Sequence, residues 1–146
     1  MTVIAWLLFA ILLLIALLHA YWGAGGTWPG RDAASCARTV TGFRGRHEMP
    51  SPAACFAVAA CLLVAAIWPL ALTGHIRVPL ASILLALGAT ALGLVFLGRG
   101  LAGFTAFWRR LTPEEPFASL DRRLYSPLCI LLGAGFIFLS IRGYRS

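Results

Sequence analysis

Residues Thr2–Tyr21 read TVIAWLLFAILLLIALLHAY and contain no Asp, Glu, Lys or Arg. A bilayer's hydrocarbon core is about 30 Å thick, so a helix rising 1.5 Å per residue needs about 20 residues to cross it. Three later stretches, 53–73, 79–98 and 125–141, have a similar composition. The chain is 60% hydrophobic and its mean hydropathy is +0.87. We therefore predict an all-α fold, a single domain over 1–146 formed by an integral membrane bundle of four transmembrane helices.

The net charge of +7 comes from arginines that stand beside these apolar spans. There they determine topology and contact anionic lipid headgroups, so we expect no nucleic-acid partner. The first and third connecting loops carry most of them: Arg31, Arg38, Arg44, Arg46, Arg109, Arg110, Arg122 and Arg123. The opposite side has only Arg77, Arg142 and Arg145. The positive-inside rule then predicts cytoplasmic first and third loops, with the N- and C-termini on the outer side.

The first span lacks both a basic n-region and an A-x-A cleavage site, so we expect a retained helix rather than a signal peptide. All basic residues are Arg, a composition associated with GC-rich bacterial genomes. Together these features predict a multi-pass protein of the bacterial inner (cytoplasmic) membrane.

Prolines and hydroxyl residues predict where the later helices begin. Ser51-Pro52 and Ser126-Pro127 each place a capping hydroxyl before a proline at the first helical position, and Pro79 opens the third span. This third helix could also continue to residue 108, in which case it must tilt or project from the membrane.

Arg99 is the main anomaly, because it interrupts a run from Pro79 to Trp108 that is otherwise free of charge. An arginine at the bilayer centre costs about 2.5–3.5 kcal/mol, which makes an intramembrane arginine a functional candidate. Arg99 lies near the cytoplasmic end of its span, however, where a long side chain can also reach the headgroups. Both interpretations stay open at this point.

Other polar and aromatic residues are expected at the same membrane depth as Arg99: His19, Trp22, Asp121 and Tyr125. Asp121 could pair with Arg99 or with the adjacent Arg122 and Arg123. His19 can exchange a proton near neutral pH or simply bond the helix end. The four cysteines form no CxxC pair, and the histidines are not spaced for haem or a metal, so we predict no cofactor and no metal site.

Two motifs resemble a family of small bacterial membrane proteins named domain of unknown function 3995. They are His19-Ala20-Tyr21-Trp22-Gly23-Ala24-Gly25-Gly26-Thr27-Trp28-Pro29 and Asp121-Arg122-Arg123-Leu124-Tyr125-Ser126-Pro127-Leu128-Cys129. The stretch Phe96-Leu97-Gly98-Arg99-Gly100 is similar as well. The resemblance implies a four-span fold and candidate residues, and it implies no reaction.

Two functions follow from these features. In the first, His19, Trp22, Arg99, Asp121 and Tyr125 form a pocket at the cytoplasmic edge that binds an amphipathic lipid, quinone or isoprenoid. In the second, the protein is an accessory or structural subunit, and its small-residue faces dock to another membrane protein or to a second copy. A proton-coupled transporter fits less well, because no Asp or Glu lies inside a predicted span.

Overall fold

The computed structural model describes residues 1–144, without the side chain of Tyr144, so Arg145 lies outside the described residues. Three of its long helices are α1 (Thr2–Gly23), α3 (Pro52–Leu72) and α4 (Ser82–Ala102). The last long segment runs through α6 (Phe117–Leu120), the π-helical turn η1 (Asp121–Tyr125) and α7 (Ser126–Tyr144). Two short helices, α2 (Ala33–Val40) and α5 (Ala106–Leu111), lie in the connections.

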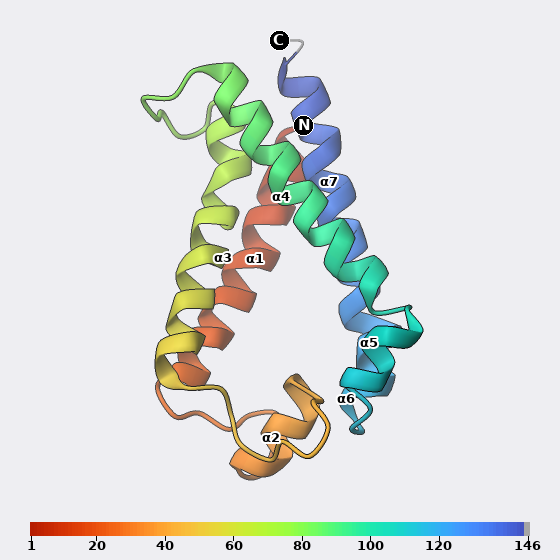
Figure 1. Ribbon diagram of the computed structural model, residues 1–146. Coiled ribbons are helices and arrows are strands. Elements are labelled where there is room, and N and C mark those ends of the chain that lie inside the picture. The colour runs from red at the N-terminus through yellow and green to blue at the C-terminus, as the bar shows by residue number, and fades with distance from the viewer. Residues whose placement is uncertain (145–146) are drawn as a thin grey trace.

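The predicted fold class is confirmed. The described residues form helices and no strands, and four helical segments are long and apolar enough to cross a membrane. The chain begins and α7 ends at one end of the bundle, whereas α2, α5 and α6 lie at the other (Figure 1). We call the latter the arginine-rich end, because it holds the arginines of the first and third loops.

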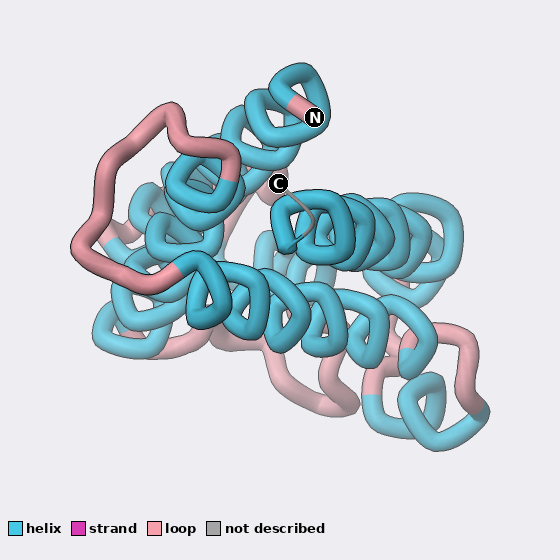
Figure 2. Tube along the Cα trace, turned by 90° about the horizontal axis from the view of Figure 1, so that it is seen from above, coloured by secondary structure: helices cyan, strands magenta, loops and turns pink. Residues whose placement is uncertain are grey.

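The four long helices associate in two pairs. α1 packs along α3, and α4 packs along α7 (Figures 1 and 2). Glycines bring the second pair together: a Cβ on Gly133 would lie 2.8 Å from the carbonyl oxygen of Gly93 and from the amide nitrogen of Leu97. Small residues at such crossings allow two backbones to make close contact in lipid, where apolar side chains gain little by leaving the acyl chains.

The buried core that joins the two pairs lies in the half of the bundle nearer the termini. It comprises Ala5, Leu8, Leu12, Ala65, Ala66, Leu70, Ala89, Leu132, Phe136 and Leu139. Towards the arginine-rich end the two pairs diverge, and α2 with its flanking loops lies below them (Figure 1). Arg99 and Asp121 therefore lie at the end of the bundle that is outside the core shared by the two helix pairs.

One expected helix start is present and two are displaced. Ser51 caps α3, because its hydroxyl accepts a hydrogen bond from the amide of Ala54 at 3.2 Å. Pro79 instead lies in the loop before α4, since Ala81 supplies the extended residue that precedes the helix. Ser126 lies within a continuous helix, because η1 carries the chain from α6 into α7 without a break.

The helix through Arg99 ends at Ala102 and does not continue to residue 108. The chain turns at Gly103 and restarts as α5, whose first turn is capped by the hydroxyl of Thr105 bonding the amide of Trp108 at 3.2 Å. This local cap satisfies amides that a continuous helix would have bonded internally. The turn also brings Trp108 back towards Arg99.

Candidate functional site

Arg99 and Asp121 form an ion pair between the end of α4 and the start of η1. The distance from Arg99 Nη2 to Asp121 Oδ1 is 2.7 Å. The Asp121 side chain is 5% exposed and the Arg99 side chain 31% exposed. Of the two pairings expected for Asp121, the structure therefore has the one with Arg99, and the carboxylate is its buried member.

Trp108 completes this polar cluster. Its indole Nε1 donates a hydrogen bond of 3.0 Å to Asp121 Oδ2, and its ring lies 4.6 Å from Arg99 Cζ. Both carboxylate oxygens of Asp121 are thus hydrogen-bonded, and the guanidinium has the cation–π contact that is favourable for arginine over indole. Arg99 and Trp108 thus compensate the burial of the Asp121 carboxylate, and Asp121 and the Trp108 ring compensate that of the guanidinium.

The absence of a side chain at Gly103 leaves room for the cluster. A side chain at Gly103 would overlap the hydroxyl of Ser126 and lie 2.9 Å from Asp121 Oδ2. Ser126 is fully buried, and its hydroxyl accepts a long hydrogen bond of 3.5 Å from Arg99 Nη1. π-helical turns widen a helix locally and occur often at functional sites, and η1 places Asp121 and Ser126 on the α4 side.

Tyr125 connects η1 to the first loop. Its hydroxyl donates a hydrogen bond of 3.3 Å to the carbonyl oxygen of Thr39 in α2, and its ring lies 5.6 Å from that of Phe117. Tyr125, from the turn that leads into α7, therefore holds α2 in place.

His19 and Trp22 lie on α1, and no hydrogen bond or ring contact joins them to Arg99 or Asp121 among the described residues. The Nδ1 atom of His19 donates to the carbonyl oxygen of Ile15 at 2.8 Å. The ring centroids of His19 and Trp22 are 5.0 Å apart. Trp22 Nε1 donates to the carbonyl oxygen of Trp28 at 2.7 Å. Since Ile15 offers only an acceptor, the proton of neutral His19 is on Nδ1 and Nε2 is an acceptor.

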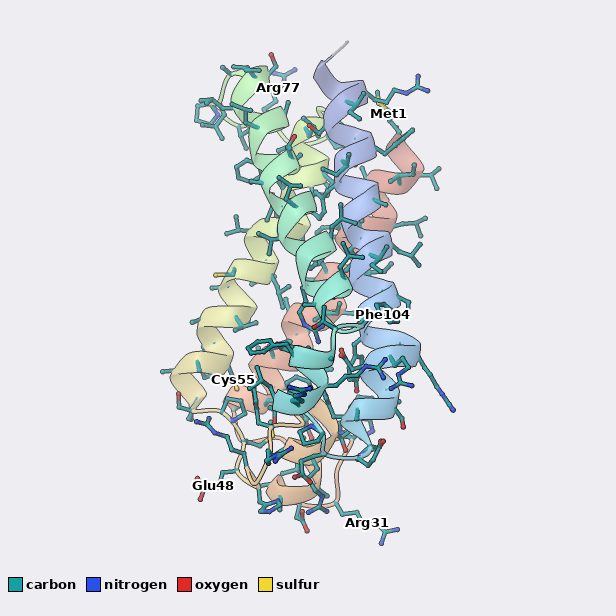
Figure 3. The ribbon with its side chains drawn as sticks, turned by 45° about the vertical axis from the view of Figure 1, so that its right-hand side comes forward. Met1, Arg31, Glu48, Cys55, Arg77 and Phe104 are labelled. Atoms are coloured by element: carbon teal, nitrogen blue, oxygen red, sulfur yellow. The ribbon has the colours of Figure 1, made fainter. Side chains whose placement is uncertain are left out.

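These two aromatic residues line a small cavity of about 130 Å³, which we call the His19 cavity. Its other walls come from the end of α2 and from α3 with the loop before it: Val40, Thr41, Met49, Pro50, Ala54, Cys55 and Val58. Apart from His19, the wall is largely apolar. Figure 3 shows the neighbourhood of Cys55, where α3 meets the loops of the arginine-rich end.

The helix α2, which contributes to that wall, is fixed by its own cap. Asp32 accepts from the amide of Ser35 at 2.8 Å, and the Ser35 hydroxyl bonds the amide of Asp32 in return. The backbone hydrogen bond from Ser35 is the main reason that the pKa of Asp32 is lowered. Cys36 is fully buried behind the cap, and burial raises the pKa of its thiol.

The five predicted site residues thus fall into two groups at the arginine-rich end. Arg99 and Asp121 meet directly, and Tyr125 extends from the same turn to α2. His19 and Trp22 line the separate cavity, whose wall includes residues 40 and 41 of that segment. Sequence reasoning missed the direct roles of Trp108 and Ser126: it used Trp108 as the end of the uncharged run and assigned Ser126 to a helix cap. The spacing of Arg99 and Trp108 gave no sign of the intervening turn.

Among the described residues, no group of three or more His, Cys, Asp or Glu side chains is arranged to hold a metal ion.

Comparison with curated proteins and with solved structures gave no match. The family model described as "Protein of unknown function (DUF3995)" matches residues 12–136. The match includes both motifs quoted from the sequence and all five predicted site residues. The chain therefore belongs to the family of domain of unknown function 3995.

Proposed function

We propose that the protein lies in the bacterial inner membrane with its arginine-rich end in the cytoplasm and both termini outside. The support is the asymmetry of the arginines, which the translocation machinery retains on the cytoplasmic side. Cysteines introduced by Ser119→Cys at the arginine-rich end and Ile76→Cys in the α3–α4 loop test this orientation. A membrane-impermeant maleimide should label only the Ile76→Cys position in intact cells, and the reverse pattern would contradict the orientation.

We further propose that the arginine-rich end binds an amphipathic molecule, of the lipid, quinone or isoprenoid class. The observation that supports this is the His19 cavity, because its wall joins a lipid-facing helix to the polar loops. Val58 in that wall is 43% exposed on the outer surface of α3, whereas Met49 and Pro50 belong to the connecting loop. A molecule with a polar head and an apolar tail fits such a boundary.

The size and polarity of the cavity restrict what enters it. Pockets that enclose a whole small ligand usually have about 300–1,000 Å³, so a cavity of 130 Å³ takes one end of a molecule whose remainder stays in lipid. Neutral His19 offers Nε2 as an acceptor, which favours a hydroxyl head such as that of a quinol or an isoprenoid alcohol. A protonated His19 would instead donate to a carbonyl.

The other three predicted residues support the cavity in this proposal. The Arg99–Asp121 pair holds α4 against the start of η1, and Tyr125 in turn holds α2 through Thr39. The end of α2 then provides Val40 in the cavity wall. Loss of any one of these contacts is expected to loosen the wall of the His19 cavity.

Mass spectrometry of molecules that co-purify in mild detergent tests the proposal. The variant His19→Ala should lose a bound lipid, quinone or isoprenoid that the unmodified protein retains. His47→Ala is the matched control, because His47 is an exposed histidine of the loop before α3 and lines neither the cavity nor the Arg99 cluster. Equal ligand content in all three proteins would contradict binding at the cavity.

A role as an accessory subunit is the second proposal, and one observation favours it. Arg99, Asp121 and Trp108 satisfy one another, as groups that stabilise a helix end do. The test is a pulldown with the Arg99→Leu variant. If this variant is folded and retains its bound molecules but no longer recovers a membrane protein partner, the result supports the subunit role and contradicts the ligand role.

A further inference from the structure

A second feature of the arginine-rich end is a basic depression that is not part of the His19 cavity. It has a volume of about 500 Å³ and is lined by Phe43, Arg44, Arg46, Arg110 and Leu111. Two segments far apart in the sequence form it, the turn after α2 and the end of α5. Three arginines thus gather around one open surface, which we call the arginine depression.

Backbone hydrogen bonds hold the two segments together. The amide of Arg44 donates to the carbonyl oxygen of Leu111, and the amide of Glu114 donates to that of Gly42, both at 3.2 Å. Gly42 and Gly45 have positive φ angles of 63° and 68°, which the turn requires and which other residues rarely adopt. The arginines are therefore presented by a defined backbone rather than by a freely moving loop.

The depression keeps an excess of positive charge. Within the described part of the chain, no carboxylate forms an ion pair with Arg44, Arg46 or Arg110, because the one ion pair there is Arg99–Asp121. Glu114 is the acidic residue that bonds the turn, because its Oε1 accepts from the amide of Gly45 at 3.3 Å. Even if Glu114 offsets one charge, the surface attracts an anion.

Apolar side chains border the same surface. Phe43 and Leu111, both in its lining, are 39% and 40% exposed. Phe43 also lies edge-on to Trp108, 6.5 Å between ring centroids, which connects the depression to the Arg99 cluster. Aromatic and aliphatic groups beside unpaired arginines are typical of the depth where a bilayer changes from acyl chains to phosphates.

We propose that the arginine depression binds the phosphate group of an anionic phospholipid. Arg44, Arg46 and Arg110 bind the phosphate oxygens, with the bidentate geometry that favours arginine for this group. Phe43 and Leu111 contact the apolar part of the lipid next to its phosphate. The volume of the depression is in the range that accommodates a headgroup. This site is independent of the His19 cavity and does not depend on the function proposed there.

Native mass spectrometry of the full chain in a nonionic detergent, with added phosphatidylglycerol or phosphatidylcholine, measures this binding. The anionic lipid should bind more tightly than the zwitterionic one. The triple variant Arg44→Gln, Arg46→Gln and Arg110→Gln should bind phosphatidylglycerol about 100-fold more weakly at low salt, since each basic residue near an anionic lipid contributes about fivefold. A loss of less than about threefold would overturn the proposal.

The control variant combines Arg31→Gln, Arg122→Gln and Arg123→Gln. It removes the same charge from exposed arginines at the same end of the molecule, outside the depression. It should bind phosphatidylglycerol within about threefold of the unmodified protein, because only general attraction is reduced. Equal weakening in both triple variants, or equal binding of the two lipids, would overturn the site. The thermal unfolding midpoint of each variant verifies that the fold is retained.

Inorganic phosphate distinguishes a lipid from a soluble phosphate compound. At an ionic strength matched with sodium chloride, inorganic phosphate should not displace phosphatidylglycerol. Displacement at millimolar phosphate would assign the depression to a free phosphate ligand and refute the lipid. His19→Ala should leave phosphatidylglycerol binding unchanged, so failure at the depression and failure at the His19 cavity give different results.

Discussion

Replacing Arg99 by leucine should destabilise the protein more than neutralising its partner with Asp121→Asn. The reason is the unequal burial of the two side chains, 5% exposed for Asp121 and 31% for Arg99. Arg99→Leu leaves a buried carboxylate whose remaining described donor is Trp108 Nε1. Asp121→Asn leaves a guanidinium that already reaches solvent, and the new amide oxygen can still accept from Trp108.

Typical costs of removing one member of an ion pair or a hydrogen bond set the magnitudes of these changes. Removing one partner of a buried ion pair costs about 3–5 kcal/mol, and the surviving bond from Trp108 places Arg99→Leu near the lower value, about 3 kcal/mol. Asp121→Asn exchanges charge-assisted hydrogen bonds for neutral ones and should cost about 1 kcal/mol. The double variant no longer holds a buried charge. It should therefore be more stable than Arg99→Leu alone, with a coupling of about 2 kcal/mol.

Unfolding by SDS in mixed micelles, followed by tryptophan fluorescence, measures the free energy of unfolding of each variant. Arg123→Leu serves as the control, because Arg123 is exposed on η1 and forms no ion pair among the described residues; its effect should stay within about 0.5 kcal/mol. The reasoning is refuted if Asp121→Asn costs as much as Arg99→Leu, or if the double variant shows the sum of the two losses.

Three further predictions concern other parts of the chain. Gly133→Ala should lower the free energy of unfolding by about 1–3 kcal/mol in the same assay, because its Cβ would press on α4, whereas Gly98→Ala, with nothing within 4 Å, should be neutral or stabilising. Cys36 should resist N-ethylmaleimide at pH 8 until SDS unfolds the protein, since burial both covers its thiol and raises its pKa. Peptide mapping is needed to separate it from the exposed Cys61, and rapid labelling of Cys36 itself in folded protein would contradict the buried position. The cap of α2 should persist at and above pH 3.8 and be lost only as the pH falls through the lowered pKa of Asp32, because the ionised carboxylate accepts the Ser35 amide. Hydrogen exchange, corrected for intrinsic rates, should show faster exchange at that amide in Asp32→Ala at pH 7, and unchanged protection would argue against the cap.

Hydropathy predicted the four spans because it depends on the solvent around each helix, and lipid imposes long apolar runs whatever the packing. It could not predict helix ends that tertiary contacts decide. Ser126-Pro127 has the composition of a helix start, yet Ser126 lies inside a continuous segment because η1 joins α6 to α7. The helix bearing Arg99 ends at Ala102 because Thr105 caps a new helix, and no periodicity in an apolar run indicates such a turn.

For the candidate site, charge and burial cost identified Arg99, and Asp121 was expected to pair either with it or with Arg122 and Arg123. Asp121 pairs with Arg99 rather than with Arg122 and Arg123 because α4 lies close to α7, and this close approach depends on glycines such as Gly103. Trp108 could not be assigned from sequence, because its contact with Asp121 requires the turn before α5. The separation of His19 from Arg99 likewise follows from helix pairing, since α1 packs with α3 and α4 with α7.

The core shared by the two helix pairs lies in one half of the bundle. The pairs are therefore held together near the termini and can move relative to one another more easily at the arginine-rich end. The far end of a helix lies about 15 residues, or about 22 Å, from that core, so rotating one pair by about 5° around the core would displace the far end by about 2 Å. The Tyr125 hydroxyl reaches Thr39 across this interval by a hydrogen bond of 3.3 Å, longer than most. Reorientation near the termini would strain that bond together with the Arg44–Leu111 and Glu114–Gly42 backbone bonds, so the geometry at the membrane boundary depends on packing most of a bilayer away.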